Sequence, residues 1–176
     1  MRQRTPTFFH FVVSEHEYLL RSDGLLLLRF GAVSKHLRLP LQGGLIDRLY
    51  ASPYENDLVL MYELDDGESG WSKVTRVSAN GSQVRWSAHV PGLNLATPCR
   101  EAGSLYLAAS GFIGKLTLKT GQFAWSHSGL YSRSHAFNVF DTPEVGESTV
   151  LFRASAQPGG SVETLLVSKE SGKLLP

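Results

Sequence analysis

The side chains that could do chemistry in this sequence are few and scattered. Ser134, His135 and Asp141 include the residue types of a hydrolytic triad. Neighbouring residues on a strand point to opposite faces, so Ser134 and His135 would not face one site together. The sequence also lacks a phosphate-binding glycine loop, a Gly-x-Ser-x-Gly elbow and a His-Glu-x-x-His motif. We therefore expect no enzymatic activity.

Metal and cofactor sites are not predicted either. The acidic segment around Asp65, Asp66 and Glu68 could offer oxygen ligands to calcium, but its spacing departs from the standard calcium loop and favours a solvated hairpin tip. Cys99 is the only cysteine, which excludes an internal disulfide and favours a small buried side chain. The histidines lack the close pair and third ligand that zinc prefers. They are His10, His16, His36, His89, His127 and His135.

Composition is that of an ordinary globular domain. The 176 residues are 42% hydrophobic and 19% charged, enough for one core and no second domain. A formal charge of +1 gives no general attraction to nucleic acid or anionic lipid. The apolar run at 8–13 is too short for a membrane helix and is followed by Glu15 and Glu17. We expect a cytoplasmic protein.

A turn-plus-strand phrase recurs along the chain. Its prolines are Pro53, Pro98 and Pro143, spaced 45 residues apart, and each precedes an apolar strand. Proline fixes φ and removes a backbone donor, which suits the end of a strand. Such a fixed period is typical of repeat architectures.

A second phrase follows each proline: a strand, a glycine turn and another strand, at 74–86, 115–125 and 165–175. Gly81 and Gly121 supply the positive φ that tight hairpins require. A degenerate first copy spans 18–39, where four leucines at 25–28 indicate a strand buried on both faces. Each repeat is therefore predicted to be an antiparallel meander.

The phrase at 114–125 resembles the strand-turn-strand repeat of quinoprotein-type, WD-like β-propellers, in which a Thr-Gly or Asn-Gly turn is followed by tryptophan. The resemblance implies an all-β fold, a small β-propeller of about four antiparallel meander blades, with an open curled β-sandwich as the alternative. It also implies that Trp86 and Trp125 pack between blades. Quinone-dependent enzymes of this type would need an adjacent cysteine pair and larger rings, so the resemblance implies architecture and not dehydrogenase activity.

The same resemblance suggests how the chain closes. The pattern of the last repeat runs out at 174–176 with no fourth strand, while the strand predicted at 7–13 precedes the first repeat. We expect residues 1–176 to form a single β-propeller-like domain in which the N-terminal strand 7–13 completes the last blade.

Two irregular segments are the predicted partner-binding loops. The connection at 127–135 is the longest of its kind, and it carries Tyr131 and Arg133, residue types enriched at interface hot spots. A merely long, solvated loop is the alternative. The second candidate is Trp71 with the acidic segment beside it. The predicted partner-binding residues are Tyr131, Arg133, His135, His127, Trp71, Asp65, Asp66 and Glu68.

By elimination, these features favour a non-enzymatic protein-binding module. A small β protein with no enzyme motif is similar, in a general way, to the bacterial immunity proteins that neutralise a cognate toxin by direct binding. We expect a monomer or a 1:1 complex with another protein, for which a toxin domain is the candidate, without cofactor, membrane or nucleic acid. The alternatives are a small-molecule-binding or hydrolytic propeller and an assembly scaffold.

Overall fold

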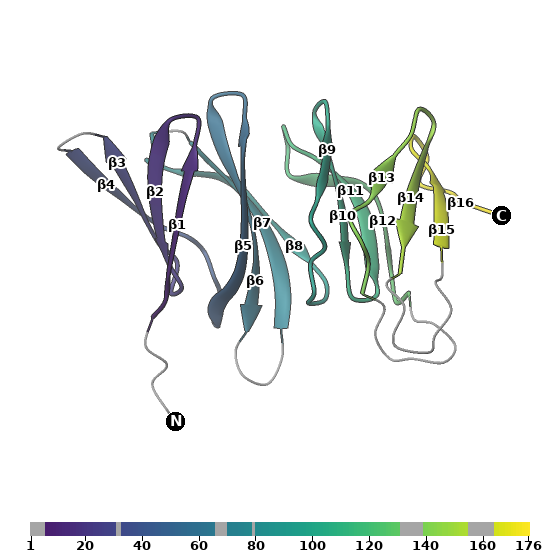
Figure 1. The fold of residues 1–176 in the computed structure, drawn as a ribbon, viewed down its shortest axis with the longest axis horizontal. Coiled ribbons are helices and arrows are strands. Elements are labelled where there is room, and N and C mark those ends of the chain that lie inside the picture. The colour runs from purple at the N-terminus through teal and green to yellow at the C-terminus, as the bar shows by residue number, and fades with distance from the viewer. Residues whose placement is uncertain (1–5, 31–32, 66–69, 79, 131–138, 155–163) are drawn as a thin grey trace. The chain divides into compact units, whose positions relative to one another are not determined.

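The computed structural model describes residues 6–30, 33–65, 70–78, 80–130, 139–154 and 164–176. All regular secondary structure in these ranges is β-strand, and no described segment is a helix able to cross a membrane. By its internal contacts the chain divides into two compact units, Met1–His89 and Val90–Pro176. Each unit contains two four-stranded sheets (Figure 1).

The first unit contains two antiparallel meanders, because each strand pairs with its neighbour in the sequence. The first sheet has the order β1-β2-β3-β4 and the second has the order β5-β6-β7-β8. The strands of the first sheet are β1 (Phe8–Val13), β2 (His16–Arg21), β3 (Leu25–Phe30) and β4 (Val33–Arg38). Those of the second are β5 (Leu45–Tyr54), β6 (Asp57–Asp65), β7 (Gly70–Ser78) and β8 (Val84–Val90).

One face of the first sheet packs on the second sheet. Alternate residues of β2 and β3 are buried there, including Tyr18, Leu20 and Leu26. They join Leu60 and Tyr62 of β6 in one apolar cluster. Successive side chains of a strand point to opposite faces. The residues of β1, β2 and β3 that alternate with this buried set therefore lie on the opposite face of the first sheet.

The second unit repeats this arrangement. Its third sheet has the order β12-β11-β10-β9, and its fourth has the order β13-β14-β15-β16. The strands of the third sheet are β9 (Cys99–Glu101), β10 (Ser104–Ala109), β11 (Phe112–Thr117) and β12 (Gln122–Ser128). Those of the fourth are β13 (Glu144–Val145), β14 (Thr149–Arg153), β15 (Thr164–Ser168) and β16 (Leu174–Leu175).

Trp125 lies in the core between the third and fourth sheets. Its ring packs against Tyr106 at 6.3 Å and edge-on to Phe152 of β14 at 6.4 Å. Its indole Nε1 donates a hydrogen bond to the Lys169 carbonyl at 3.2 Å. The predicted packing role of this tryptophan between two sheets is confirmed, whereas Trp86 on β8 is half-buried.

The expected meander repeats are present. The hairpins predicted at 74–86, 115–125 and 165–175 are β7–β8, β11–β12 and β15–β16. Pro98 and Pro143 directly precede β9 and β13, and Pro53 lies near the end of β5. Each proline thus lies in the first strand of a sheet or directly before that strand.

The prediction for the N-terminal strand is wrong. Residues 8–13 form β1, but β1 pairs with β2, from Phe8 opposite Arg21 to Val13 opposite His16. The described fourth sheet draws all four strands from 144–175. The cause is the turn at Ser14 and Glu15, whose φ angles are 48° and 65°. Positive φ at both turn positions makes a tight hairpin that folds β1 directly back onto β2.

Candidate functional site

The first candidate surface is the face of the first sheet that points away from the second sheet, here called the first-sheet outer face. The pairing of His10 with Leu19, and of Leu19 with Leu27, places these three side chains in one row across β1, β2 and β3. Glu17 and Arg29 form a neighbouring polar pair on the same face. The row therefore has an apolar centre with charged groups beside it.

Two large apolar side chains of this face are strongly exposed. Phe8 is 57% exposed and Val12 is 63% exposed, and both lie on β1 on the same side as His10. The other side of β1 carries Phe9 and Phe11, which pack against the core of the first unit. Strand β1 therefore carries large apolar side chains on both sides, and on the open side His10 lies between Phe8 and Val12.

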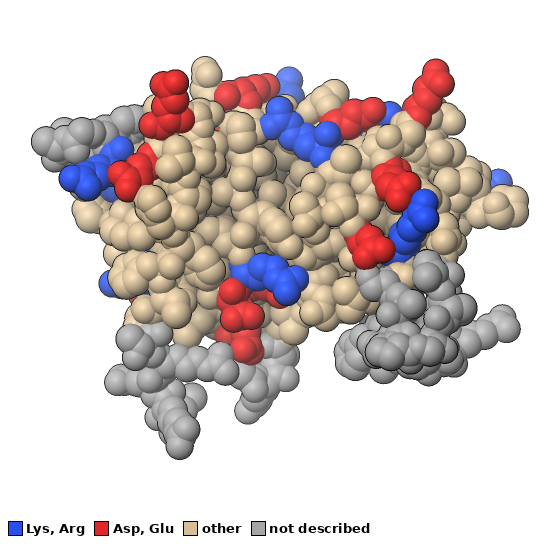
Figure 2. Space-filling view, viewed as in Figure 1, with Lys and Arg blue, Asp and Glu red and all other residues tan. Residues whose placement is uncertain are grey.

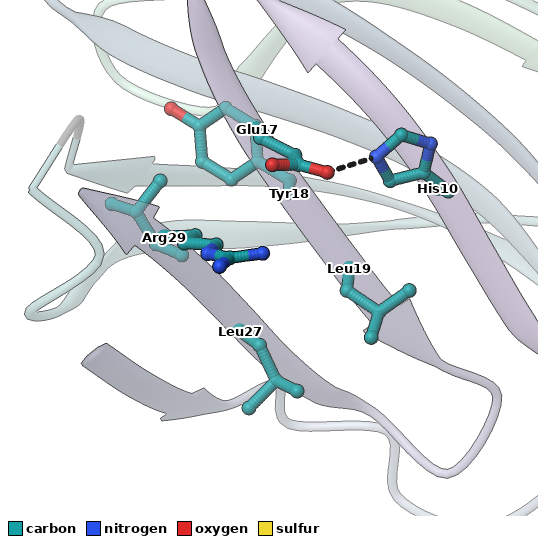
Figure 3. A pocket seen from close by; sticks show the side chains of 7 residues that line it. His10, Glu17, Tyr18, Leu19, Leu27 and Arg29 are labelled. Carbon is teal, nitrogen blue, oxygen red and sulfur yellow. Dashed lines mark hydrogen bonds and ion pairs between the residues drawn. The ribbon is translucent and has the colours of Figure 1, made fainter. Parts of the chain in front are cut away.

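A hollow of about 210 Å³ lies on this face. Leu19 and Leu27 belong to its lining, together with His10, Glu17 and Arg29 (Figure 3). His10 Nε2 and Glu17 Oε1 are 2.7 Å apart, so these two side chains are hydrogen-bonded to each other across β1 and β2. The hollow thus combines leucine side chains with polar groups able to form hydrogen bonds, a combination found at protein interfaces.

The hairpin between β2 and β3 fixes one end of this face. Asp23 accepts hydrogen bonds from Arg21 Nε at 2.7 Å and Arg21 Nη2 at 2.6 Å, and Arg38 Nη1 lies 3.7 Å from its Oδ2. The Arg21 hydrogen bonds lower the pKa of Asp23 to about 2 despite partial desolvation. The ion pair holds the strand ends together at neutral pH.

The fourth sheet has a comparable outer face, which we call the fourth-sheet outer face. Val150, Phe152 and Val167 belong to the core of the second unit. Leu151 and Leu166 alternate with them along the strands and therefore lie on the opposite side. The register continues this row from Glu144 through Leu151 and Leu166 to Leu175. The three leucines are half-buried.

The second candidate surface is the end of the fourth sheet from which two long connections leave. Phe140 and Ala154 form an antiparallel bridge, and the Asp141 amide donates a hydrogen bond to the Arg153 carbonyl at 2.9 Å. Phe140 follows the segment 131–138, and Ala154 precedes the segment 155–163. The bridge therefore brings an end of one connection beside an end of the other.

Most of the predicted partner-binding residues lie outside the described part of the chain. These are Tyr131, Arg133, His135, Asp66 and Glu68. Asp65 ends β6 and pairs with Gly70 across the hairpin. His127 is a residue of β12 and not of a loop, and its Nε2 lies 2.7 Å from the Gly172 carbonyl oxygen.

Trp71 is placed differently from what its position at a loop junction suggested. It lies on β7 opposite Leu64, and its half-buried side chain packs against the apolar core of the first unit. Trp71 therefore has a packing role within the first unit.

The described part of the chain contains no group of three His, Cys, Asp or Glu residues able to hold a metal ion. Cys99 is half-buried rather than fully buried, and burial raises the pKa of its thiol. The Tyr106 hydroxyl is buried, and within the described ranges no side chain meets it in good hydrogen-bond geometry. Burial and the nearby Glu101 carboxylate raise the pKa of Tyr106 to about 12, so this hydroxyl stays protonated.

Charged side chains of both signs are interspersed on the surface. In the view of Figure 2, lysines and arginines lie beside aspartates and glutamates over the described part of that face. Ion pairs between described residues include Lys169 with Glu101 and Arg153 with Glu144. This pattern agrees with the formal charge of +1.

The sequence reasoning missed the first-sheet outer face. The signal was the run Leu25 to Leu28, which predicts a strand buried on both faces. In the structure Leu26 and Leu28 are fully buried, while Leu25 and Leu27 on the outer side are half-buried. The run therefore marks a second apolar face that the described chain covers incompletely.

No family model matches the chain, and no curated protein matches it by sequence. Solved structures do match its fold. AztD of Citrobacter koseri matches 95% of the chain and 45% of its own length, with a TM-score of 0.58 and 15% identity. A europium-containing methanol dehydrogenase matches 94% of the chain and 40% of its own length, with a TM-score of 0.55 and 10% identity.

The computationally designed Ika4 protein matches 93% of the chain and 93% of its own length, with a TM-score of 0.52 and 14% identity. The chain thus spans about half the length of AztD and of the methanol dehydrogenase, but nearly all of Ika4. At these identities the similarity concerns the fold. The chain has an all-β, propeller-type fold of four antiparallel four-stranded sheets, and quinoprotein-type propellers are among its structural neighbours.

Proposed function

We propose that this chain is a non-enzymatic protein-binding module. Its partner contacts the second candidate surface, the end of the fourth sheet at the bridge between Phe140 and Ala154, here called the loop end of the second unit. The observation that carries the proposal is the bridge between Phe140 and Ala154, which brings together the ends of two long connections. Loops held by rigid sheets are common binding elements, because they vary without loss of the core.

The residue types in the first of these connections suit a protein partner. Tyr131 and Arg133 combine apolar area with hydrogen-bond donors, and both types are enriched at interface hot spots. The base of the connection is well supported, since Leu130 donates a backbone hydrogen bond to the Gly111 carbonyl at 3.0 Å.

In its finer form, the proposal is that the partner is a toxin domain and that the chain is a bacterial immunity protein acting in the cytoplasm. Neutralisation by direct binding requires a stable surface and no chemistry of its own. The single free thiol of Cys99 suits a reducing compartment. The balanced surface charge favours a partner recognised by shape and hydrogen bonding over one attracted by net charge.

The experiment compares three purified baits in the lysate of the native host: the wild-type chain, a Tyr131→Ala/Arg133→Ala variant, and Lys119→Ala as a matched control. Lys119 is exposed in the β11–β12 turn, at the other end of β12 from the connection. A protein retained by the wild type and by Lys119→Ala, but lost by the double variant, is then purified and titrated calorimetrically.

We expect each hot-spot truncation to cost about 2 kcal/mol or more of binding free energy, roughly thirtyfold in affinity. The free energy of unfolding should change by about 0.5 kcal/mol or less, as at other surface sites. Equal affinity of the double variant and the wild type would assign the interface to another surface. For the immunity role, the partner expressed alone must arrest growth, and co-expression of the chain must restore it.

A further inference from the structure

We propose that the hollow on the first-sheet outer face binds a small monocarboxylic acid with an apolar body. Arg29 holds the carboxylate of this ligand, and Leu19 and Leu27 contact its body. All residues that line the hollow belong to the first unit, so the proposal is independent of the loop end of the second unit and of the function assigned there. It rests on the register of the strands, the charge beside the hollow and the volume of the hollow.

The strand register places the apolar and the polar parts of the hollow in two neighbouring rows. Leu19 lies opposite Leu27, and in the next row Glu17 lies opposite Arg29. Residues two apart in a strand point to the same face, so all four side chains lie on the first-sheet outer face. Figure 3 shows the polar side chains on one side of the hollow and the two leucines on the other. The hollow is therefore amphipathic.

Arg29 is the cationic group available to a ligand in this hollow. Its side chain is exposed, and no hydrogen bond or ion pair joins it to another described residue. Glu17 lies opposite Arg29, but its Oε1 is hydrogen-bonded to His10 Nε2 at 2.7 Å. Arg21, on the same face, is by contrast engaged by Asp23 through two hydrogen bonds. The N–H donors of Arg29 can therefore form two parallel hydrogen bonds with a ligand carboxylate.

The leucines provide the contact for the apolar body of the ligand. Leu19 and Leu27 are half-buried, so a ligand that covers them removes apolar surface from water. The hollow has a volume of about 210 Å³. An apolar protein cavity of about 150 Å³ holds one benzene ring, and sites for drug-sized ligands begin at about 300 Å³. The volume therefore suits a phenyl ring or short alkyl chain that carries a small polar group.

The charges beside the hollow favour a carboxylate over a phosphate or an amine. A single guanidinium matches a singly charged carboxylate, whereas a phosphate carries more charge than Arg29 neutralises and is repelled more strongly by Glu17. An amine could pair with Glu17, but His10 already occupies one oxygen of that carboxylate and Arg29 would repel the amine.

The test titrates the whole chain with three probes that share a phenylpropyl body: 3-phenylpropanoate, 3-phenylpropan-1-ol and 3-phenylpropan-1-amine. Amide chemical shifts report binding. We expect a dissociation constant of about 1–10 mM for the carboxylate, as is usual for so small a ligand. The alcohol should bind about tenfold more weakly, because it lacks the charge-assisted hydrogen bonds. The shifts should change in β1 to β3 and stay unchanged in β9 to β16.

Matched variants separate the charge from the apolar contact. Arg29→Gln should reduce the affinity for the carboxylate to that for the alcohol, whereas Arg100→Gln, at an exposed arginine on β9, should keep the tenfold preference. Leu27→Ala should weaken the binding of both probes by about threefold or more, because both lose apolar contact. Leu25→Ala is its control, since Leu25 lies on the same strand and face but does not line the hollow.

Four results would overturn the proposal. Equal binding of carboxylate and alcohol to the wild type, or a carboxylate preference that survives in Arg29→Gln, would exclude the role of Arg29. Tighter binding of the amine would mean that Glu17 selects the charge of the ligand. A lack of saturable shifts in β1 to β3, at probe concentrations several times the expected dissociation constant, would exclude the site.

Thermal unfolding of each variant establishes that it is folded. The Tyr131→Ala/Arg133→Ala variant should bind 3-phenylpropanoate as the wild type does. Loss of partner capture at the loop end and loss of ligand binding in the first unit are therefore observed separately.

Discussion

Gly172 is a residue whose replacement should have a large and specific effect. It has a φ of +74°, and an added Cβ would lie 2.4 Å from Trp125 Cγ. Gly129 has a nearly equal φ of +71°, and no atom of the described residues lies within 4 Å of the same position. The two glycines thus share the backbone conformation and differ in their surroundings.

We predict that Gly129→Ala lowers the free energy of unfolding by about 1 kcal/mol through backbone conformation alone. Gly172→Ala should lower it by about 2–4 kcal/mol, because overpacking against Trp125 adds to the same backbone term. Urea denaturation followed by tryptophan fluorescence measures both. Equal losses at the two sites would show that Gly172 does not pack on the indole.

Asp23 should make stability depend on pH in the acid range. Arg21 lowers the pKa of Asp23 in the folded chain from 3.8 to about 2. The stabilisation that the Asp23 carboxylate contributes is therefore present at pH values above the unfolded-state pKa and is lost as the pH falls toward 2. Asp23→Asn should cost no more than about 1 kcal/mol at pH 7, since the pair is partly exposed.

The measurement is the difference in the free energy of unfolding between wild type and Asp23→Asn as a function of pH. Both proteins contain the other carboxylates, so the contributions of those groups largely cancel in this difference. This difference should shrink between pH 3.8 and about 2. A difference that stays constant over this range would mean that the Arg21–Asp23 pair does not stabilise the fold.

At the scale of elements, the β1–β2 hairpin carries removable strain. Ser14 and Glu15 both have positive φ, a conformation that Asn and Gly adopt more readily than other residues. Ser14→Asn/Glu15→Gly should therefore stabilise the chain by about 0.5–1 kcal/mol. Glu170→Gly is the control, because Glu170 is exposed in a turn without positive φ, and it should be neutral or destabilising. Loss of stability in the hairpin variant would argue against the pairing of β1 with β2.

The elements also show how local patterns specified most strands. Asn80-Gly81 and Thr120-Gly121 predicted hairpins, and both glycines have the expected positive φ. The turn at Ser14 and Glu15 has neither residue type that such turns usually require, so the local pattern does not predict the pairing of β1 with β2.

At the scale of the whole molecule, the two units should respond differently to removal of β1. Phe9, Phe11 and Val13 pack in the core of the first unit, and β1 is an edge strand of the first sheet. Deletion of residues 1–13 should therefore increase amide hydrogen exchange in β2 to β8 and leave β9 to β16 nearly unchanged. Faster exchange confined to the fourth sheet would contradict the packing of β1 in the first unit.

By itself, the sequence determined the all-β class, the meander repeats and the proline period. These depend on short-range properties: alternation of apolar residues, positive φ at glycine and the fixed φ of proline. Tertiary structure decided that β1 pairs with β2, that Trp71 packs inward, and that the leucines of β3 divide between a covered and an open face. Each of these depends on contacts between residues distant in the chain or on turns of uncommon composition, which the local pattern does not encode.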